Sequence, residues 1–166
     1  MNARRQFARP SRQRGVAAIE FALVFMLGIL PMLLITINGV MIFAAQQSLT
    51  LASAEGARAA LQYGTPAQRQ ANACNAAQNA MAWLLTFSGE TASCATPPTP
   101  GGAYTPVAVS AAAACPSNAN VQCITVVTSF DYNNHPFIPG VTALYGWVLS
   151  SSLSSSATVQ MNPAGS

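Results

Sequence analysis

The stretch RGVAAIEFA, from Arg14 to Ala22, leads from a basic segment into a long apolar one. No charged residue lies between Phe21 and Ala45, and at ~1.5 Å per residue a helix of that length can cross a hydrocarbon layer of ~30 Å. The basic side chains that precede it are Arg4, Arg5, Arg9, Arg12 and Arg14. By the positive-inside rule they keep the N-terminus in the cytoplasm, so the sequence predicts one membrane span with everything after Gln46 exported.

We expect the apolar helix to continue beyond the membrane as a rod. Good helix formers occupy residues 46–63, and Gly64 is a typical helix stop. Within the apolar run, Pro31 lacks the amide that would bond to the carbonyl of Leu27, which predicts a bend. Gly56 costs about 1 kcal/mol relative to alanine inside a helix, and therefore indicates close packing against another backbone.

A second helix is predicted to start after Thr65. The string Thr65-Pro66-Ala67-Gln68 combines an N-cap, a proline at the first helical position and a capping-box glutamine. Apolar residues then recur at the spacing of one helix face until about Phe87, before Gly89. They are Ala67, Ala71, Cys74, Ala77, Met81 and Leu84. Cys74 is therefore expected to point inward.

Strand patterns follow in the C-terminal half. Residues 122–132 and 153–161 alternate between apolar and polar side chains, which predicts two strands, and residues 104–109 add a third. The inward-facing sets are Ile124, Val126, Phe130 and Tyr132 on one strand, and Leu153, Ala157, Val159 and Met161 on the other. Residues 96–102 are predicted to form a loop, and residues 141–148 are predicted to form a short amphipathic helix. The predicted fold class is α+β, with a long N-terminal helix, a second helix and an antiparallel sheet.

The cysteines all lie on the exported side of the apolar run, where an oxidising compartment favours disulfides. They are Cys74, Cys94, Cys115 and Cys123. Pairing of sequence neighbours, Cys74 with Cys94 and Cys115 with Cys123, closes the shortest loops, while the other connectivities stay open. A metal site is disfavoured because no pair has the CxxC spacing and the single histidine, His135, lies well past Cys123.

The charge pattern bears on other functions. Only 7% of residues are charged, and beyond Gly15 the only basic side chains are Arg58 and Arg69, so no basic face is available for nucleic acid. The exported acidic residues are Glu55, Glu90 and Asp131, none adjacent to another. The remaining possibility for an enzyme is a catalytic dyad of the Cys123 thiol and the His135 imidazole. We therefore expect a protein that is not an enzyme and has no catalytic residues, no cofactor and no metal.

Two motifs resemble those of a known family. A basic leader, a glycine, then a glutamate and an aromatic residue before an apolar run resemble a prepilin processing site. More narrowly, residues 14–22 and the later Ala54-Glu55-Gly56-Ala57-Arg58 are similar to TadE-like minor pilins of the Flp/Tad tight-adherence pilus, which begin RG-x-x-A-[IV]-E-F-A and carry a Glu-Gly-Ala-Arg element. The similarity is strong over residues 12–60 and looser afterwards, and the cysteine-bearing region 74–123 matches no pattern of the family.

The resemblance implies a minor pilin or pseudopilin with a small pilin-like exported domain. A prepilin peptidase would cut between Gly15 and Val16, with Glu20 and Phe21 completing the processing site. After cleavage Glu20 would pair with the new N-terminal amine of a neighbouring subunit, since two charges that are each costly in lipid become tolerable together. The implied domains are a leader at 1–15, a transmembrane helix and rod at 16–63, and a disulfide-containing domain at 64–166.

The resemblance also implies partners, a location and an assembly surface. The residues implied in assembly are Glu20, Glu55, Gly56 and Arg58. The partners would be the prepilin peptidase, other Flp/Tad pilins, the inner-membrane assembly platform and membrane lipid. The protein would sit in the inner (cytoplasmic) membrane or in the pilus, and would serve pilus assembly, adhesion and surface colonisation.

A secreted or membrane-anchored extracytoplasmic protein of non-pilus function is the alternative. Arg4-Arg5-Gln6-Phe7 resembles a twin-arginine signal, and Ala52-Ser53-Ala54 resembles a signal-peptidase site. The apolar regions of secretory signals run ~7–15 residues, however, and the uncharged run from Phe21 to Ala45 is longer. This mismatch favours the pilin reading.

Overall fold

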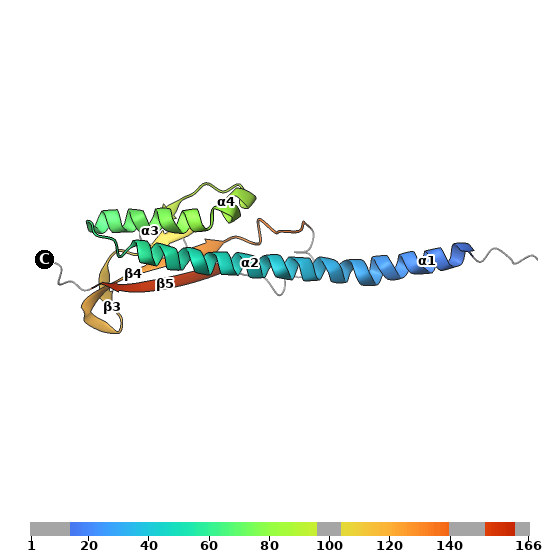
Figure 1. The fold of residues 1–166 in the computed structure, drawn as a ribbon, viewed down its shortest axis with the longest axis horizontal. Helices are drawn as coiled ribbons and strands as arrows, with labels where there is room; N and C mark the ends of the chain where they lie inside the picture. The colour runs from blue at the N-terminus through green and yellow to red at the C-terminus, as the bar shows by residue number, and fades with distance from the viewer. Residues whose placement is uncertain (1–13, 96–103, 140–151, 162–166) are drawn as a thin grey trace, which may run out of the picture. The chain divides into compact units, whose positions relative to one another are not determined.

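The computed structural model describes residues 14–95, 104–139 and 152–161 (Figure 1). The leader up to residue 13, the loop expected at 96–102 and the helix expected at 141–148 lie outside these residues. The chain divides into two compact units, Met1–Gly39 and Val40–Ser166. The boundary falls within a helix, and each unit is considered by itself.

The first unit is helical throughout its described residues. Helix α1 (Arg14–Val24) is followed by a π-helical turn, η1 (Phe25–Ile29), and by the start of α2 (Leu30–Ala59). In η1 the N–H of Leu30 donates to the carbonyl of Phe25, one residue further back than in an α-helix. The turn directly precedes Pro31, whose ring disturbs the α-helical carbonyl ladder. The bend predicted at Pro31 stays a prediction, and the feature that the structure shows just before it is this wide helical turn.

In the second unit α2 stops at Ala59, short of the end expected at Tyr63. The N–H groups of Leu61 and Gln62 donate to carbonyls three residues back, at 3.1 and 3.2 Å. Such bonds tighten the last turn of a helix and satisfy carbonyls that would otherwise lack partners. Gly64, with a φ of 154°, then turns the chain toward the next helix, as its role as a stop predicts.

Helix α3 (Pro66–Ala80) begins with the predicted capping box. The Thr65 hydroxyl accepts from the Gln68 N–H at 3.3 Å, and the Gln68 side chain accepts from the Thr65 N–H at 2.8 Å. The apolar stripe is confirmed in its later part, where Cys74, Ala77, Met81 and Leu84 are buried. It is wrong at Ala67 and Ala71, which are exposed because the buried face is centred on Ala73 and Ala77.

The second helix is interrupted once, at Met81. This residue has φ −106° and ψ 17°, outside the α-helical region, and separates α3 from α4 (Ala82–Ser88). Gly89 ends α4 in the left-handed conformation, with φ 69°. The predicted end before Gly89 is therefore confirmed, whereas the break at Met81 carries no proline or glycine that the sequence could signal.

A five-stranded sheet lies beside these helices. Its strands are β1 (Cys94–Ala95), β2 (Val107–Val109), β3 (Ala113–Cys115), β4 (Asn118–Phe130) and β5 (Leu153–Met161). Strand β5 pairs antiparallel with β4 from Gln122↔Met161 to Phe130↔Leu153, while β2 and β3 share the other edge of β4. Strand β1 pairs parallel with β2, so the sheet is mixed. The two unpredicted strands, β1 and β3, are too short to show an alternating pattern.

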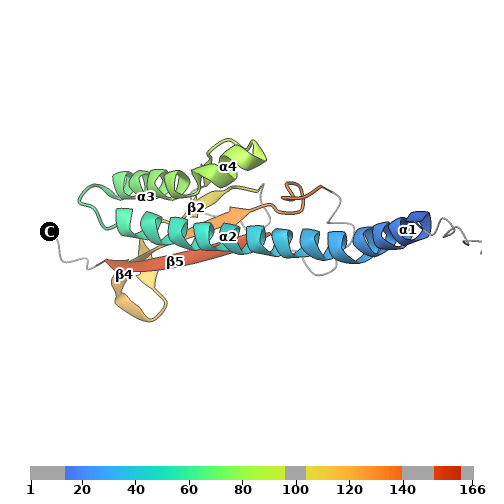
Figure 2. The same ribbon diagram turned by 45° about the vertical axis from the view of Figure 1, so that its right-hand side comes forward.

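The core of the second unit lies between the helices and one face of the sheet (Figures 1 and 2). The predicted inward set is confirmed: Ile124, Val126 and Phe130 on β4, and Tyr132 two residues past the end of the strand, are all at most 1% exposed. Alanines on the helices face them and permit close approach, among them Ala52, Ala60, Ala73 and Ala77. Thr128 is the polar exception on this face, and its buried hydroxyl donates to the carbonyl of Leu49 at 2.9 Å.

Candidate processing and assembly site

The described helix of the first unit exposes mostly apolar side chains. Every residue from Gly15 to Leu30 is exposed, including Leu27 at 77%. The continuous helix Gly15–Ala59 is long and apolar enough to cross a membrane, and none of its most apolar window is buried within the protein. A helix that is apolar on all sides needs an apolar surrounding. The first unit therefore fits a lipid bilayer or a bundle of like helices.

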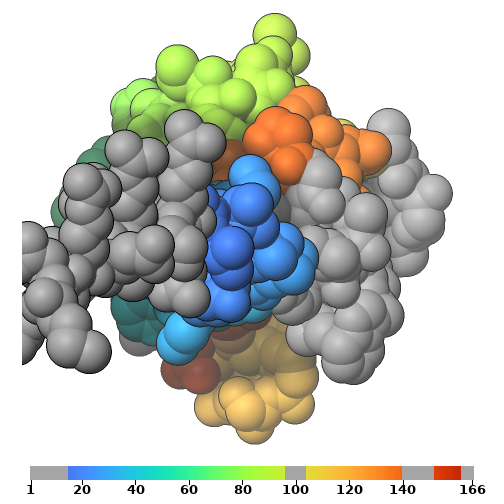
Figure 3. All heavy atoms as spheres, turned by 90° about the vertical axis from the view of Figure 1, so that its right-hand side faces the viewer, coloured from blue at the N-terminus to red at the C-terminus, as the bar shows by residue number. Residues whose placement is uncertain are grey.

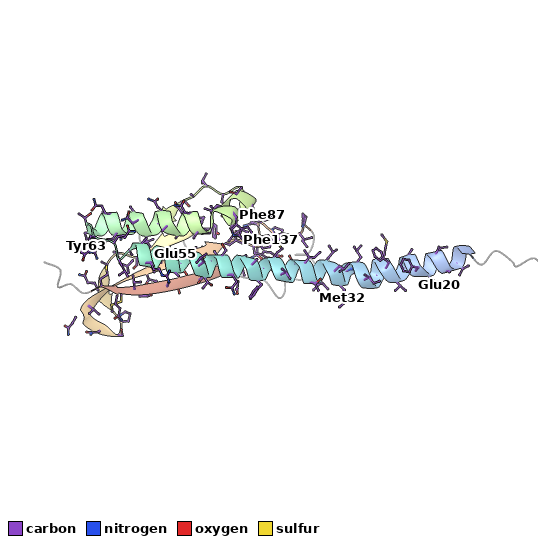
Figure 4. All side chains as sticks on the ribbon, in the orientation of Figure 1. Glu20, Met32, Glu55, Tyr63, Phe87 and Phe137 are labelled. Carbon is purple, nitrogen blue, oxygen red and sulfur yellow. A yellow bond between two sulfur atoms is a disulfide. The ribbon has the colours of Figure 1, made fainter. Side chains whose placement is uncertain are left out.

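The predicted processing residues lie at the start of this helix. Gly15 and Val16 are in the first turn of α1, and a Cβ added at Gly15 would meet nothing within 4 Å. Phe21 is 68% exposed, and its ring stacks on that of Phe25 at 6.3 Å. Glu20 projects from α1 (Figure 4) and is the only charged residue between Gly15 and Ala54. Its carboxylate is exposed and has no ion-pair partner in the part of the chain that the structure describes.

The second motif, Ala54–Arg58, lies near the C-terminal end of α2 and has two faces. On the outer face the guanidinium of Arg58 contacts the carboxylate of Glu55 at 3.1 Å, with side chains 75% and 42% exposed. Such an i,i+3 pair is worth only ~0.2–0.5 kcal/mol to the helix. The two charges remain accessible to a partner of either sign.

The inner face of the same motif packs into the fold. A Cβ on Gly56 would lie 3.0 Å from the carbonyl oxygen of Ala73, 3.0 Å from Cγ1 of Val126 and 3.1 Å from Cβ of Ala77. The predicted close approach of Gly56 to another backbone is thus confirmed, and that backbone belongs to α3. Ala57, only 3% exposed, lies on the same side. The glycine and alanine of the motif therefore serve packing within the second unit, and this packing explains the glycine at position 56 without the assembly role that the resemblance implies for Gly56.

The cysteines form the two bridges favoured by sequence neighbourhood. Cys74 is bonded to Cys94, tying α3 to β1, and Cys115 is bonded to Cys123 within the β3–β4 hairpin. The hairpin and the helices α3 and α4 lie at opposite edges of the second unit in Figure 3, where they are gold and green. No cysteine is free, so Cys123 offers no thiolate to His135.

One polar cluster could not be predicted from the sequence. His135 faces Glu90, with Nε2 3.8 Å from Oε1, although the two residues are far apart in the chain. The other carboxylate oxygen, Oε2 of Glu90, is buried without a hydrogen-bond partner. Tyr104 lies nearby, and its hydroxyl donates to the carbonyl of Ser129 at 2.7 Å. Burial, reinforced by the Glu90 carboxylate, raises the pKa of the Tyr104 hydroxyl, so it stays protonated.

This cluster lacks the parts of a hydrolytic or metal site among the residues that the structure places. The second carboxyl group in the neighbourhood, Asp131, accepts hydrogen bonds from Asn134. No group of three or more metal-ligating side chains occurs within 14–95, 104–139 and 152–161. The arrangement is that of a loop anchored on the end of α4.

Residues 15–58 match the model of a protein family described as TadE-like protein. The match starts at Gly15 and ends at Arg58, so it spans both motifs, and the predicted resemblance to the TadE-like family is confirmed over this segment. It covers α1, η1 and nearly all of α2. No significant match was found among curated proteins or among solved structures.

Proposed function

We propose that this chain is a minor pilin or pseudopilin of a Flp/Tad pilus system, trimmed by a prepilin peptidase between Gly15 and Val16. The observation that carries the proposal is the coincidence of the TadE-like segment, residues 15–58, with a helix whose exposed, apolar stretch at residues 15–30 holds one carboxylate, Glu20. A structural role in pilus assembly and adhesion follows from that similarity, and catalysis is not required of any residue.

In this proposal each segment has one task. Residues 1–15 direct insertion with their arginines and are then removed, residues 16–63 hold the subunit in the inner membrane and later in the pilus, and residues 64–166 form the exported domain. Disulfides stabilise a domain of this size in an oxidising compartment. Removal of the leader leaves Arg58 and Arg69 against four acidic residues, so the topogenic positive charge is gone once insertion is complete.

In the proposed function, assembly depends on the negative charge of the Glu20 carboxylate. A carboxylate at the centre of a membrane helix costs about 2.5–3.5 kcal/mol by insertion scales, and less near the end. Cleavage after Gly15 would create an ammonium group on Val16, one helical turn from Glu20. Pairing Glu20 with the ammonium of a neighbouring subunit would compensate both charges and set the stagger between adjacent helices.

Intact-mass analysis of the protein purified from its own membranes tests the cleavage. We expect a mature form that starts at Val16, and a full-length form when Gly15 is replaced by leucine, because a bulky side chain would occupy the space beside the scissile bond. The matched control is Gly28→Leu, in the same helix and also with open space around it, which should be trimmed normally. A native chain that starts at Met1 or Glu55, or normal trimming of Gly15→Leu, would contradict the proposal.

A further inference from the structure

An aromatic patch on the second unit has no part in processing or in the Glu20 pairing. It consists of Trp83 and Phe87 on α4 and Phe137 in the segment after β4. The ring of Phe137 lies 6.3 Å from that of Trp83 and 5.0 Å from that of Phe87, and Figure 4 shows Phe87 beside Phe137. Trp83 and Phe87 are 41% and 46% exposed, although they are among the largest apolar side chains in the unit. We call these three residues the aromatic patch.

The height of the patch along α2 is fixed by a hydrogen bond. The indole N–H of Trp83 donates to the hydroxyl of Ser48, on α2, at 2.9 Å. Gly56 of α2 packs against Ala73 and Ala77, whereas the earlier residue Ser48 bonds to the later residue Trp83, so the chain from α3 to α4 runs antiparallel to α2. Figures 1 and 2 show α4 continuing from α3 alongside earlier residues of α2, and Phe87, labelled in Figure 4, lies one turn beyond Trp83 in that direction.

The same stretch of α2 is where the helix would leave the membrane. The run of large exposed apolar side chains on it ends with Val40 and Phe43, at 67% and 64%; from Gln46 on, polar and small residues predominate, and Leu51, at 54%, is an isolated exception. Ser48 follows Phe43 by five residues, about 7.5 Å along the helix. The headgroup layer on each side of a bilayer is roughly 5–7.5 Å thick, so with the hydrocarbon boundary at Phe43 a group at the level of Ser48 lies at the outer edge of that layer.

The chemistry of the patch suits this layer. Tryptophan is enriched at membrane–water interfaces because its ring is apolar and its N–H is polar. Helix α4, AWLLTFS, contains no charged residue. The charged groups that flank the patch in sequence, Glu90 and His135, face each other and are mostly covered, so they present little charge to a lipid surface.

We propose that the aromatic patch inserts among the lipid headgroups on the exported face of the membrane and holds the second unit against it before the subunit enters a pilus. This inference rests on the proposed membrane span of the helix. The partner of the patch is lipid. We therefore expect Trp83 to lie at the depth of the headgroups, in contact with the shallow part of the acyl chains. A subunit released into a pilus would lose this contact.

Fluorescence quenching by brominated lipids tests the proposal on the full chain in nanodiscs. The Trp147→Phe variant leaves Trp83 as the only tryptophan. We expect Trp83 emission to fall when bromine is placed near the headgroups, and to fall less when it is placed deep in the acyl chains. The control places the single tryptophan at residue 63 (Trp83→Phe, Trp147→Phe and Tyr63→Trp), at the far end of the unit, where Tyr63 is fully exposed (Figure 4); it should not be quenched.

A second single-tryptophan variant separates this inference from the proposed span. Phe25→Trp, with Trp83 and Trp147 both changed to phenylalanine, reports on the apolar helix itself and should be quenched by deep bromines. If the emission of the tryptophan at residue 25 is quenched and that of Trp83 is not, the lipid contact of the patch is overturned while the proposed membrane span stands. If the emission at residue 25 is not quenched either, the proposed membrane span itself is contradicted. Emission from Trp83 that depends on protein concentration and not on brominated lipid would assign the patch to a second subunit, and would also overturn the inference.

Discussion

Gly56 shows how one residue of a family motif can be explained by packing inside the subunit. Its missing side chain lets α2 approach the backbone of α3 and the side chain of Val126 on β4. The helix gives up about 1 kcal/mol of propensity for this approach. The neighbouring charges, Glu55 and Arg58, make no such contact and remain on the surface, so they are the members of the motif available to a partner.

Gly56→Ala should destabilise the protein although alanine is the better helix former. A Cβ there would sit 3.0 Å from a backbone carbonyl oxygen that cannot rotate away, and overpacking of this kind costs about 1–3 kcal/mol. After subtraction of the helix gain of about 1 kcal/mol, we expect a net loss of up to about 2 kcal/mol. Thermal unfolding of the detergent-solubilised protein, followed by circular dichroism, measures it.

Gly39→Ala is the matched control for this prediction. Gly39 lies in the same helix, α2, and a Cβ added there meets nothing within 4 Å. It should leave the unfolding temperature unchanged or raise it. Equal effects of the two substitutions would show that helix propensity, and not close packing, explains Gly56.

Among the helices and strands, the sequence predicted those features that have a local signal, such as a capping motif or a periodic apolar pattern. The capping box at Thr65, the inward face of β4 and the alternation of β5 all appeared in the structure, because each depends on neighbours within a few residues. The break at Met81 and the short strands β1 and β3 were missed. They depend on pairing and packing between distant segments, which local sequence does not encode.

The two disulfides should contribute unequally to the stability of the second unit. In the chain-entropy model a longer loop is worth more, and the separations are 20 residues for Cys74–Cys94 and 8 for Cys115–Cys123. The shorter loop is also already closed by the β3–β4 pairing. We expect replacement of both Cys74 and Cys94 by alanine to cost up to about 3 kcal/mol, and replacement of Cys115 and Cys123 to cost clearly less.

Chemical denaturation of the two double-alanine variants under non-reducing conditions measures this difference. Alanine avoids burying a new hydroxyl group at these sites, where Cys74, Cys115 and Cys123 are at most 8% exposed. The native protein, unfolded and alkylated without reductant, should show no free thiol. A larger loss from the hairpin bridge would mean that β3 and β4 do not pair without it.

At the scale of the whole molecule, the family motifs could be recognised from the sequence, whereas the contacts between distant segments could not. Gly15, Glu20 and the Ala54–Arg58 motif were recognisable because they are local strings, and residues 15–58 carry the family match. The pairing of His135 with Glu90 and the aromatic patch of Trp83, Phe87 and Phe137 needed the fold, since each joins α4 or its end to the segment after β4. The family similarity thus lies in the helix, and the features that needed the fold lie in the second unit.

The last prediction concerns how the whole subunit joins others through Glu20. In the proposed function the arginines before Gly15 set the topology and Gly15 marks the cut, so assembly is the step that still needs a charge at this depth. Glu20→Gln keeps size and polarity and removes only the charge. It should be inserted and trimmed normally, yet fail to co-purify with other pilins or to support piliation, since each neighbouring ammonium would be left unpaired at a cost of order 1–3 kcal/mol. The control is Glu55→Gln, on the part of the same helix that is predicted to be exported. It should be inserted into the membrane and trimmed normally. An uncleaved Glu20→Gln would instead assign Glu20 to peptidase recognition, and unchanged piliation would reduce it to a residue at the membrane boundary.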